Sequence, residues 1–321
     1  MAILSAPPSH PRHIMLTVVA ALLPGTLALL GWYGTAMLAN LIVAVLASVA
    51  TEAALMRLRQ YDPLRAIQDG SALLTGLLLG LALPPDTHWG IVVTAAVFAV
   101  GLGKHAYGGI GQNIFNPAVV GYALVLVSFP AALAAWPIVG NTTTDALSGA
   151  TTLSVFRYRE GMTVDEVWQT ARGFGTIGGY PAEWINLAFL AGGLFLVWRR
   201  FAAWRAPAAF LGTLGLLGLA GYDNGSSQSL GSPFFHWFSG GTMLAAWFFL
   251  TDPVTHPASH RGQLWFGAIV GVVTWVIRSF GGYPDGIAFG ILLANGAAAW
   301  LDRTTYPRQH NRQPPSEAHE P

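Results

Sequence analysis

A short polar stretch holds the residues best suited to chemistry. It runs Asp145-Ala146-Leu147-Ser148-Gly149-Ala150-Thr151 and lies in the one long polar interruption of an otherwise apolar chain. Its last residue, Thr151, offers a hydroxyl nucleophile, and the three residues before it are small. A hydroxyl on a mobile, exposed segment with small neighbours can enter the active site of another enzyme and accept a bulky group. We therefore take Thr151 as a candidate site of covalent modification.

The same stretch resembles the acceptor motif on which a flavin transferase attaches FMN to threonine through a phosphoester. In that motif an aspartate and two further residues precede Ser-Gly-Ala-Thr, as Asp145 precedes Ser148, Gly149, Ala150 and Thr151 here. A flavin tethered in this way stays bound through repeated redox cycles, which suits an electron carrier. The alternative is an ordinary loop, because these residue types are common in loops and further threonines lie nearby, namely Thr142, Thr143, Thr144 and Thr152.

The composition of the chain is that of an integral membrane protein. Hydrophobic residues make up 53% of the 321 and charged residues only 10%, with a mean hydropathy of +0.49. No basic patch with interleaved aromatic side chains is present, so we expect no nucleic-acid partner. The chain has no cysteine, and it therefore carries no disulfide and no Cys-ligated iron-sulfur cluster. Electrons that pass through it need an organic cofactor.

Apolar runs predict an all-α membrane protein with about ten spans in two sets of five. The first set is 14–31, 36–56, 71–83, 89–103 and 114–135, and the second is 185–198, 207–221, 234–250, 264–280 and 285–301. Several are shorter than the roughly 20 residues of a straight crossing and rich in glycine, which favours broken or re-entrant helices. Alternatively, glycines such as Gly76 and Gly80 serve close helix packing.

The placement of lysine and arginine predicts the topology. Four arginines fall on one side of the membrane, namely Arg157, Arg159, Arg172 and Arg278, which leaves 16 − 4 = 12 basic residues on the other side. The side that is richer in lysine and arginine is usually the cytoplasmic side. We therefore expect cytoplasmic tails at 1–13 and 303–321, and a periplasmic loop at 136–184 that carries Thr151. The two five-helix repeats then occupy 14–135 and 185–302 of a multi-pass protein of the bacterial inner membrane.

Two glycine-containing patterns recur along the chain. The pattern that begins at Gly70 recurs from Gly240, and the pattern at Gly108 recurs at Gly281, with offsets of 240 − 70 = 170 and 281 − 108 = 173. Because each half has an odd number of spans, the second half must be inverted relative to the first. Inverted repeats place sites near their interface at mid-membrane depth. The alternative is the ordinary glycine-rich composition of membrane segments.

Polar residues near the spans supply further candidates. The segment 104–118 contains Asn113 and Asn116, whose amides are candidate contacts for a flavin ring. The alternative is a helix entry in which Asn116 caps the helix and Pro117 takes its first position. That alternative leaves Gly108 to Asn113 unexplained.

Charged side chains within spans are costly, so each is a functional candidate. Glu52 lies near the inner end of the second span, where the alternative is an interfacial salt bridge with Arg57. Asp69, Asp252 and Asp285 lie at span ends, where they could cap helices, bind a cation or contact a flavin. These four acids are our ion-path candidates. His256 and His260 are spaced as metal ligands on a helix, but nearby prolines argue against a helix, so we predict no metal site and no catalytic residue.

Five ordered stretches together resemble the family of Rnf-complex D subunits, which is similar to the B subunits of sodium-translocating NADH:quinone reductases. They are Asp69–Gly76, Gly111–Ala118, Ser148–Thr151, Thr251–Thr255 and Gly281–Gly286. Relatives of the quinone-reductase type usually carry a longer N-terminal extension, so the D subunits are the nearer match.

The resemblance implies a membrane subunit of a complex that couples ferredoxin and NAD electron exchange to sodium or proton translocation. It implies FMN on Thr151, in exchange with the flavin of a partner G subunit, and a non-covalent riboflavin between the halves near Asn113. It also implies a flavin transferase during maturation and no net reaction from the isolated subunit. The alternatives are a quinone-reducing subunit and a small-solute channel or transporter without redox chemistry.

Overall fold

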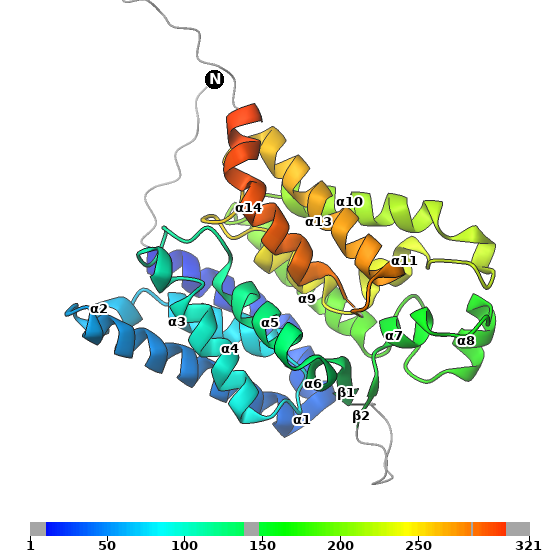
Figure 1. Cartoon of the computed structure of the whole chain (residues 1–321), viewed down its shortest axis with the longest axis horizontal. Coiled ribbons are helices and arrows are strands. Elements are labelled where there is room, and N and C mark those ends of the chain that lie inside the picture. The colour runs from blue at the N-terminus through cyan, green and yellow to red at the C-terminus, as the bar shows by residue number, and fades with distance from the viewer. Residues whose placement is uncertain (1–10, 138–147, 284, 306–321) are drawn as a thin grey trace, which may run out of the picture.

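The computed structural model describes residues 11–137, 148–283 and 285–305, which are almost entirely helical (Figure 1). The first helix, α1, runs Pro11–Leu58 and at 48 residues is too long for one straight span. Its backbone breaks at Gly34, where φ is 60° and ψ is −138°, a conformation that glycine adopts without steric cost. The break lies between the predicted spans 14–31 and 36–56, so α1 contains both.

The rest of the first half consists of shorter helices. They are α2 (Pro63–Ile67), α3 (Ser71–Ala82), α4 (Trp89–Gly101), the 3-10 turn η1 (His105–Tyr107), α5 (Pro117–Ser128) and α6 (Pro130–Ala134). At the start of α5 the side chain of Asn116 accepts a hydrogen bond from Val119 N at 3.3 Å, and Pro117 takes the first helical position. The helix-entry role expected for Asn116 is thus present.

The predicted loop between the halves is partly structured. Strands β1 (Ala135–Pro137) and β2 (Ser148–Ala150) form a two-stranded antiparallel sheet, followed by helices α7 (Thr152–Arg157) and α8 (Val164–Thr170). A capping box, in which Thr163 and Glu166 bond each other's backbone amides, starts α8. A small apolar cluster of Leu153, Phe156 and Phe235 lies beneath these helices.

The second half again has five predicted spans. Its elements are α9 (Ala182–Trp198), α10 (Arg205–Ala220), the 3-10 turn η2 (Asp223–Gly225), α11 (Pro233–Phe238), α12 (Thr242–Leu244), the π-helical turn η3 (Ala245–Phe249), α13 (His260–Phe280) and α14 (Ile287–Thr305). The predicted span 234–250 is interrupted at residues 239–241, where Gly240 has a φ of 60°. A broken helix of the predicted kind therefore occurs here.

Length and composition support a polytopic membrane protein. Within the described ranges, three helical segments are long and apolar enough to cross a membrane, namely Arg12–Leu58, Trp89–Tyr107 and His260–Phe280. Four shorter apolar helices accompany them: α3, α5, α9 and α10. Large apolar side chains are exposed on the outer faces, such as Leu27 on α1 and Leu216 on α10. A lipid environment would cover these faces.

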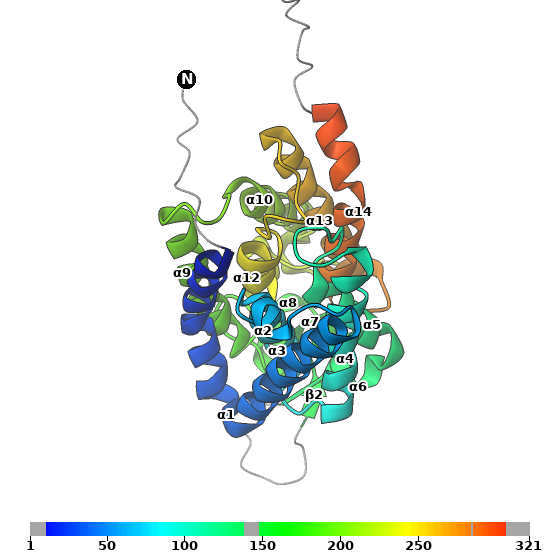
Figure 2. The ribbon, with the colours of Figure 1, turned by 90° about the vertical axis from the view of Figure 1, so that its left-hand side faces the viewer.

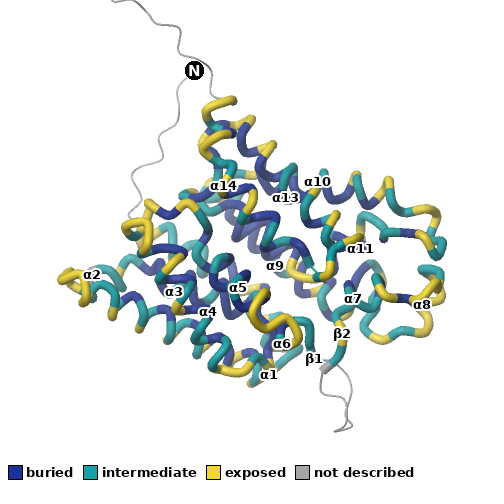
Figure 3. Tube along the Cα trace, in the orientation of Figure 1, coloured by how far each residue is buried: buried dark blue, intermediate teal, exposed yellow. Residues whose placement is uncertain are grey.

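The two halves lie side by side and meet along a central seam. In the first half, α1 packs against α3 and α4, and α4 packs against α5; in the second, α10 packs against α13, and α13 against α14. Across the seam, α1 contacts α9 and α5 contacts α14, as Figures 1 and 2 show. Buried residues concentrate along this seam (Figure 3).

Small residues let the helices approach closely, as the sequence suggested for α3. A Cβ atom on Gly76 would lie 2.6 Å from Val45 Cα, and one on Gly80 would lie 3.0 Å from Leu41 Cδ2. Both contacts are with α1. The packing role of these two glycines is confirmed.

Candidate functional site

A cavity of about 750 Å³ lies between the two halves, on the side of the β1–β2 sheet. We call it the central cavity. Cofactor pockets usually measure about 300–1,000 Å³ and combine an apolar lining with a few polar groups. The central cavity has this character, since its lining is mostly aliphatic and aromatic but includes polar or charged residues from separate elements, namely Thr151, Arg172, Asn186 and Asp285.

Thr151 stands at the edge of this cavity, fixed between β2 and α7. It is the N-cap of α7, and its Oγ1 accepts a hydrogen bond from Ser154 N at 3.2 Å. Its backbone follows directly from a strand in which Gly149 lies opposite Trp136 and Ala150 opposite Ala135. The side chain is half-buried, whereas the sequence suggested an exposed, mobile segment. Ser148 lies on β2, and Asp145 lies outside the described residues.

The neighbouring threonine is already committed to the fold. Thr152 Oγ1 donates a hydrogen bond to Gly173 O at 2.9 Å. A Cβ atom on Gly179 would lie 2.7 Å from the same oxygen, so the hydroxyl is packed against that segment. Both hydroxyls are thus hydrogen-bonded, that of Thr151 locally to Ser154 and that of Thr152 to the distant Gly173. Thr142, Thr143 and Thr144 lie outside the described residues.

Arg172 brings a positive charge to the cavity, and the sequence analysis gave it no role beyond topology. It is exposed, lines the central cavity and precedes Gly173, the residue bonded to Thr152. Arg157 and Arg159 are held by backbone carbonyls, and burial lowers the pKa of the Arg159 guanidinium. Within the described part of the loop, Arg172 is the arginine with no hydrogen bond or ion pair. Its charge is free to meet an anion.

Asp285 lines the central cavity but is paired. Its carboxylate accepts two hydrogen bonds from Arg278, Nε to Oδ1 at 3.1 Å and Nη2 to Oδ2 at 3.0 Å. The buried Arg278 also donates to His236 O at 2.8 Å and to Thr242 Oγ1 at 2.9 Å. It thereby joins the end of α11 to the start of α12. Asp285, a predicted ion-path residue, thus pairs with the arginine that links α11 to α12 across the helix break at residues 239–241.

Asn113 and Asn116 lie elsewhere, on a second cavity of about 90 Å³ between the halves. We call it the small cavity. Its polar lining includes Ser71, Lys104 and Asp252. Asn113 donates to Phe115 O at 3.0 Å, so it shapes its own turn. The structure does not bring these two asparagines together with Thr151.

A buried ionic network adjoins the small cavity. Lys104 Nζ donates to Glu52 Oε1 at 2.9 Å and to Ser71 Oγ at 2.7 Å, and His105 Nε2 lies 3.0 Å from Glu52 Oε2. Ser71 in turn donates to Asp69 Oδ1. Glu52 is only 2% exposed and pairs with Lys104 and His105, so the alternative of a salt bridge with Arg57 is wrong. Two of the predicted ion-path residues, Glu52 and Asp69, therefore share one network.

Asp252, the fourth candidate acid, ties the halves together beside the small cavity. It accepts from Asn116 Nδ2 at 3.1 Å and from Thr255 Oγ1 at 3.2 Å. The backbone amide of Asn116 donates to Asn295 Oδ1 at 3.1 Å, so α14 joins the same cluster. The predicted acids thus divide between two cavities, three near the small one and Asp285 at the central one.

The linings of the two cavities also show in which direction four of the central segments run between the cavities. Helix α3 begins at the small cavity with Ser71 and ends at the central cavity with Ala82. The chain from α12 through η3 runs the other way, from Gly241 at the central cavity to Asp252 at the small one. Helices α5 and α14 are opposed in the same manner. This is the arrangement of an inverted repeat.

A cation-to-hydroxyl pair recurs within this inverted arrangement. Lys104, after α4, bonds Ser71 at the start of α3, and Arg278, at the end of α13, bonds Thr242 at the start of α12. The offsets are 278 − 104 = 174 and 242 − 71 = 171. They agree with the 170 and 173 of the sequence patterns, so the two pairs are structurally equivalent.

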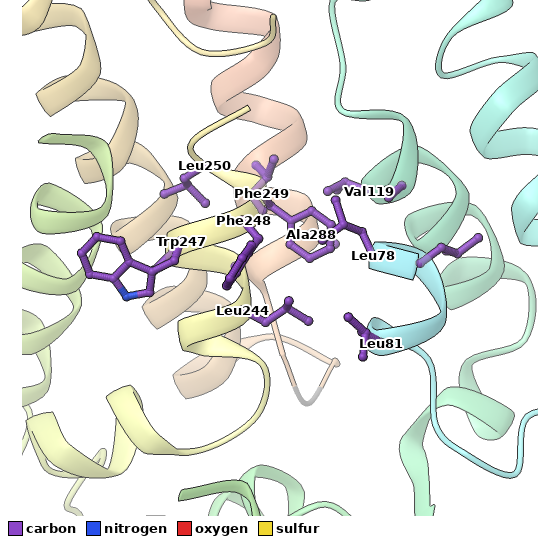
Figure 4. Close-up of a cluster of buried hydrophobic side chains, with 14 of the residues drawn as sticks. Leu78, Leu81, Val119, Leu244, Trp247, Phe248, Phe249, Leu250 and Ala288 are labelled. Atoms are coloured by element: carbon purple, nitrogen blue, oxygen red, sulfur yellow. The ribbon is translucent and has the colours of Figure 1, made fainter. Parts of the chain in front are cut away.

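An apolar layer separates the two cavities. We define it by the side chains labelled in Figure 4 that point into the seam, namely Leu78, Leu81, Val119, Leu244, Phe248, Phe249 and Ala288. None of them is more than 6% exposed. They come from α3, α5, α12, η3 and α14, so both halves contribute.

Comparison with known proteins covers nearly the whole chain. The sequence model of the NQR2, RnfD, RnfE family matches residues 7–311. A protein of Pseudomonas paraeruginosa, named as the D subunit of an ion-translocating oxidoreductase complex, is 46% identical over an alignment that covers 95% of this chain and 93% of the relative. Proteins of the same name from Klebsiella pneumoniae and Escherichia coli are 40% and 39% identical, with 97% of this chain covered and 99% and 98% of the relatives. The chain therefore belongs to the NQR2, RnfD, RnfE family.

Proposed function

We propose that this chain is an RnfD-type subunit of an ion-translocating oxidoreductase complex and carries FMN covalently on Thr151. The names of its relatives support the first part. The observation that carries the second part is the position of Thr151 at the edge of a cavity of about 750 Å³ between the halves. A hydroxyl acceptor and a space of cofactor size thus lie side by side.

The residues around the central cavity fit a phosphate-linked flavin. Thr151 would hold the phosphoester through Oγ1. Arg172, which has no described partner, would offset the negative charge of the phosphodiester at the cavity mouth. The apolar lining would exclude water from the ring, while Arg278 and Asp285 keep the helix break in place. When bound, the flavin supplies one- and two-electron redox chemistry.

The small cavity is the candidate place for a non-covalent riboflavin. Asn113, Asn116 and Lys104 offer hydrogen-bonding groups there. Its volume of about 90 Å³ is below the usual size of a cofactor pocket, so the surrounding side chains would have to move to admit a ring. The donor chemistry fits a flavin, and the space does not.

At the level of the complex, we propose that the tethered flavin exchanges electrons with the flavin of a partner G subunit. The chain would sit in a bacterial inner membrane with both tails cytoplasmic and Thr151 periplasmic, where a flavin transferase acts. The complex would couple ferredoxin and NAD electron transfer to sodium or proton movement. A quinone-reducing subunit would instead be recognised by quinone reduction in the purified complex.

The test of the tether is flavin fluorescence of the denatured subunit in a gel, after expression with a flavin transferase. Wild type should fluoresce and Thr151→Ala should be dark. Because alanine also removes the cap of α7, at a cost of about 0.5–2 kcal/mol, Thr151→Asn is the sharper variant. Asparagine keeps a capping side chain and lacks the hydroxyl.

Two further variants complete the test. Thr151→Ser, which keeps both cap and hydroxyl, should retain fluorescence, and so should Thr152→Ala, which loses only the bond to Gly173. A dark wild-type band in the presence of active transferase would refute the tether. A bright Thr151→Asn band would show that flavin is attached elsewhere.

A further inference from the structure

We propose that Trp136 and Tyr33 form an aromatic wall of the central cavity against which the isoalloxazine ring of FMN on Thr151 lies. This inference rests on the proposed function, because it concerns the flavin that Thr151 would carry. It assigns a ring-binding role to two residues outside the tether motif. Both line the central cavity, and both are half-buried.

The sheet places Trp136 beside the tether. In the antiparallel register Trp136 lies opposite Gly149, two residues before Thr151. Paired residues in such a sheet have Cα atoms about 4.5–5.5 Å apart, and two residues along a strand span about 7 Å. Glycine leaves the space across from the indole unfilled by a side chain. A ring at the end of a short ribityl chain on Thr151 therefore comes within reach of the indole.

Tyr33 completes the wall from helix α1. It lies in α1, directly before the break at Gly34. Its ring meets that of Trp136 edge to face, with centroids 5.9 Å apart and an interplanar angle of 62°. The pairing holds the indole in one orientation at the cavity border. A second edge-to-face pair, Trp32 with Tyr180, follows at the rim.

Three other aromatic residues of the lining are less suited to receive the ring. Phe174 packs with Trp168 and Phe235 in the cluster beneath the loop. Phe189 is 2% exposed and packs edge to face on Phe248. Tyr180 is 39% exposed at the rim. Trp136 and Tyr33 combine cavity contact, partial burial and closeness to the tether.

The wall has a consequence that can be measured. An indole in contact with a flavin donates an electron to the photoexcited ring and returns it without emission, which quenches flavin fluorescence. The tethered flavin should therefore be dim in the folded protein and bright after denaturation. Phenylalanine cannot donate in this way, yet it keeps an aromatic ring of similar shape.

The experiment compares the flavin emission of purified, tethered subunit before and after denaturation, free of non-covalent flavin. In wild type the emission should rise severalfold on denaturation. In Trp136→Phe the native emission should already be high, so the increase in flavin emission on denaturation should be smaller than in wild type. In the double variant with Tyr33→Phe this increase should be smaller still. The matched control is Trp198→Phe, on α9, where the indole is 75% exposed and lies outside the cavity lining. The ratio of its flavin emission after denaturation to that before denaturation should equal the ratio of wild type.

The outcomes separate this inference from the tether itself. A dark denatured wild type refutes the tether. A bright denatured band with the same emission ratio in Trp136→Phe and wild type refutes the wall and leaves the tether in place. Fluorescence anisotropy decay of wild type gives a second measurement that needs no variant. A ring on the wall should rotate with the whole protein, and free nanosecond rotation would overturn the inference.

Discussion

The buried pair of Glu52 and Lys104 illustrates what single residues do in this membrane interior. Each charge is almost fully buried, and each is hydrogen-bonded. Two such charges are tolerated only because each supplies the counter-charge of the other, with His105 and Ser71 completing the set. The sequence identified Glu52 as costly but named the wrong partner, because Lys104 is 52 positions away and only the packing of α4 against α1 brings it near.

Removal of one member should cost more than removal of both. We expect Lys104→Met to lower the free energy of unfolding by about 3–5 kcal/mol, since it leaves the Glu52 carboxylate buried without its lysine. The double variant Glu52→Gln with Lys104→Met should recover much of that loss, which a thermal unfolding series in detergent would measure. Strictly additive losses would contradict an energetically coupled pair.

Thr151 and Arg172 show the limit of motif analysis at the scale of residues. The motif gives the proposed acceptor but not its surroundings, because the cavity beside Thr151 is lined by residues of β1, α9 and the segment around residue 172. Arg172 carried no local signal beyond its charge. The bond between Thr152 and Gly173 and the shared cavity lining show that Arg172 lies near Thr151.

At the scale of elements, the break between α11 and α12 is the feature that shapes the central cavity. Gly240 and Gly241 both line it. Arg278 bonds the carbonyl end of α11 and the first hydroxyl of α12, which satisfies groups that a broken helix would otherwise leave unpaired. The break is therefore a stabilised feature of the fold that forms part of the cavity wall.

Two adjacent glycines offer a matched test of this break. Gly240→Ala should destabilise the protein, because a φ of 60° costs a residue with a Cβ about 1–2 kcal/mol and the Cβ would lie 2.7 Å from Asp285 Oδ2. Gly241→Ala is the control, with a φ of −96° and no atom within 4 Å of the added Cβ. Thermal unfolding in detergent distinguishes them. Equal stability of the two variants would show that the break tolerates other geometries.

The apolar runs of the sequence predicted the long helices well, but they did not predict the strands and short helices of the loop between the halves. The predicted spans match the two parts of α1 and the later helices because apolar length alone sets a crossing. The β1–β2 sheet was missed because its strands have three residues each and pair across a gap in sequence. The helices α7 and α8 were missed because six or seven residues carry too little periodicity for a helix to be predicted.

At the scale of the whole molecule, the inverted halves yield two unequal cavities from one plan. The cation-to-hydroxyl pairs of Lys104 with Ser71 and Arg278 with Thr242 occupy equivalent places, yet one adjoins the small cavity and the other the central cavity. The sequence patterns at Gly70 and Gly240 indicated the repeat only faintly. Geometry preserves the relation more clearly, because a buried cation must keep a partner even where neighbouring side chains differ.

The apolar layer between the cavities bears on what can cross the molecule. A hydrated ion would have to shed its water among leucine, valine and phenylalanine side chains, at a prohibitive cost in free energy. An electron needs no hydrated path. This layer argues against the channel alternative and is compatible with an electron-carrying subunit.

We therefore expect proteoliposomes of the isolated subunit to leak sodium or protons no faster than empty liposomes. Phe249→Ala, which removes a large side chain of the layer at the border of the central cavity, should create a measurable leak and lower stability by about 3–5 kcal/mol. Phe195→Ala, on α9 and 37% exposed, is the control and should stay tight. An ion-sensitive dye trapped inside the liposomes reports all three. If the wild type itself conducts, the layer is no seal, and a channel function has to be reconsidered for the molecule as a whole.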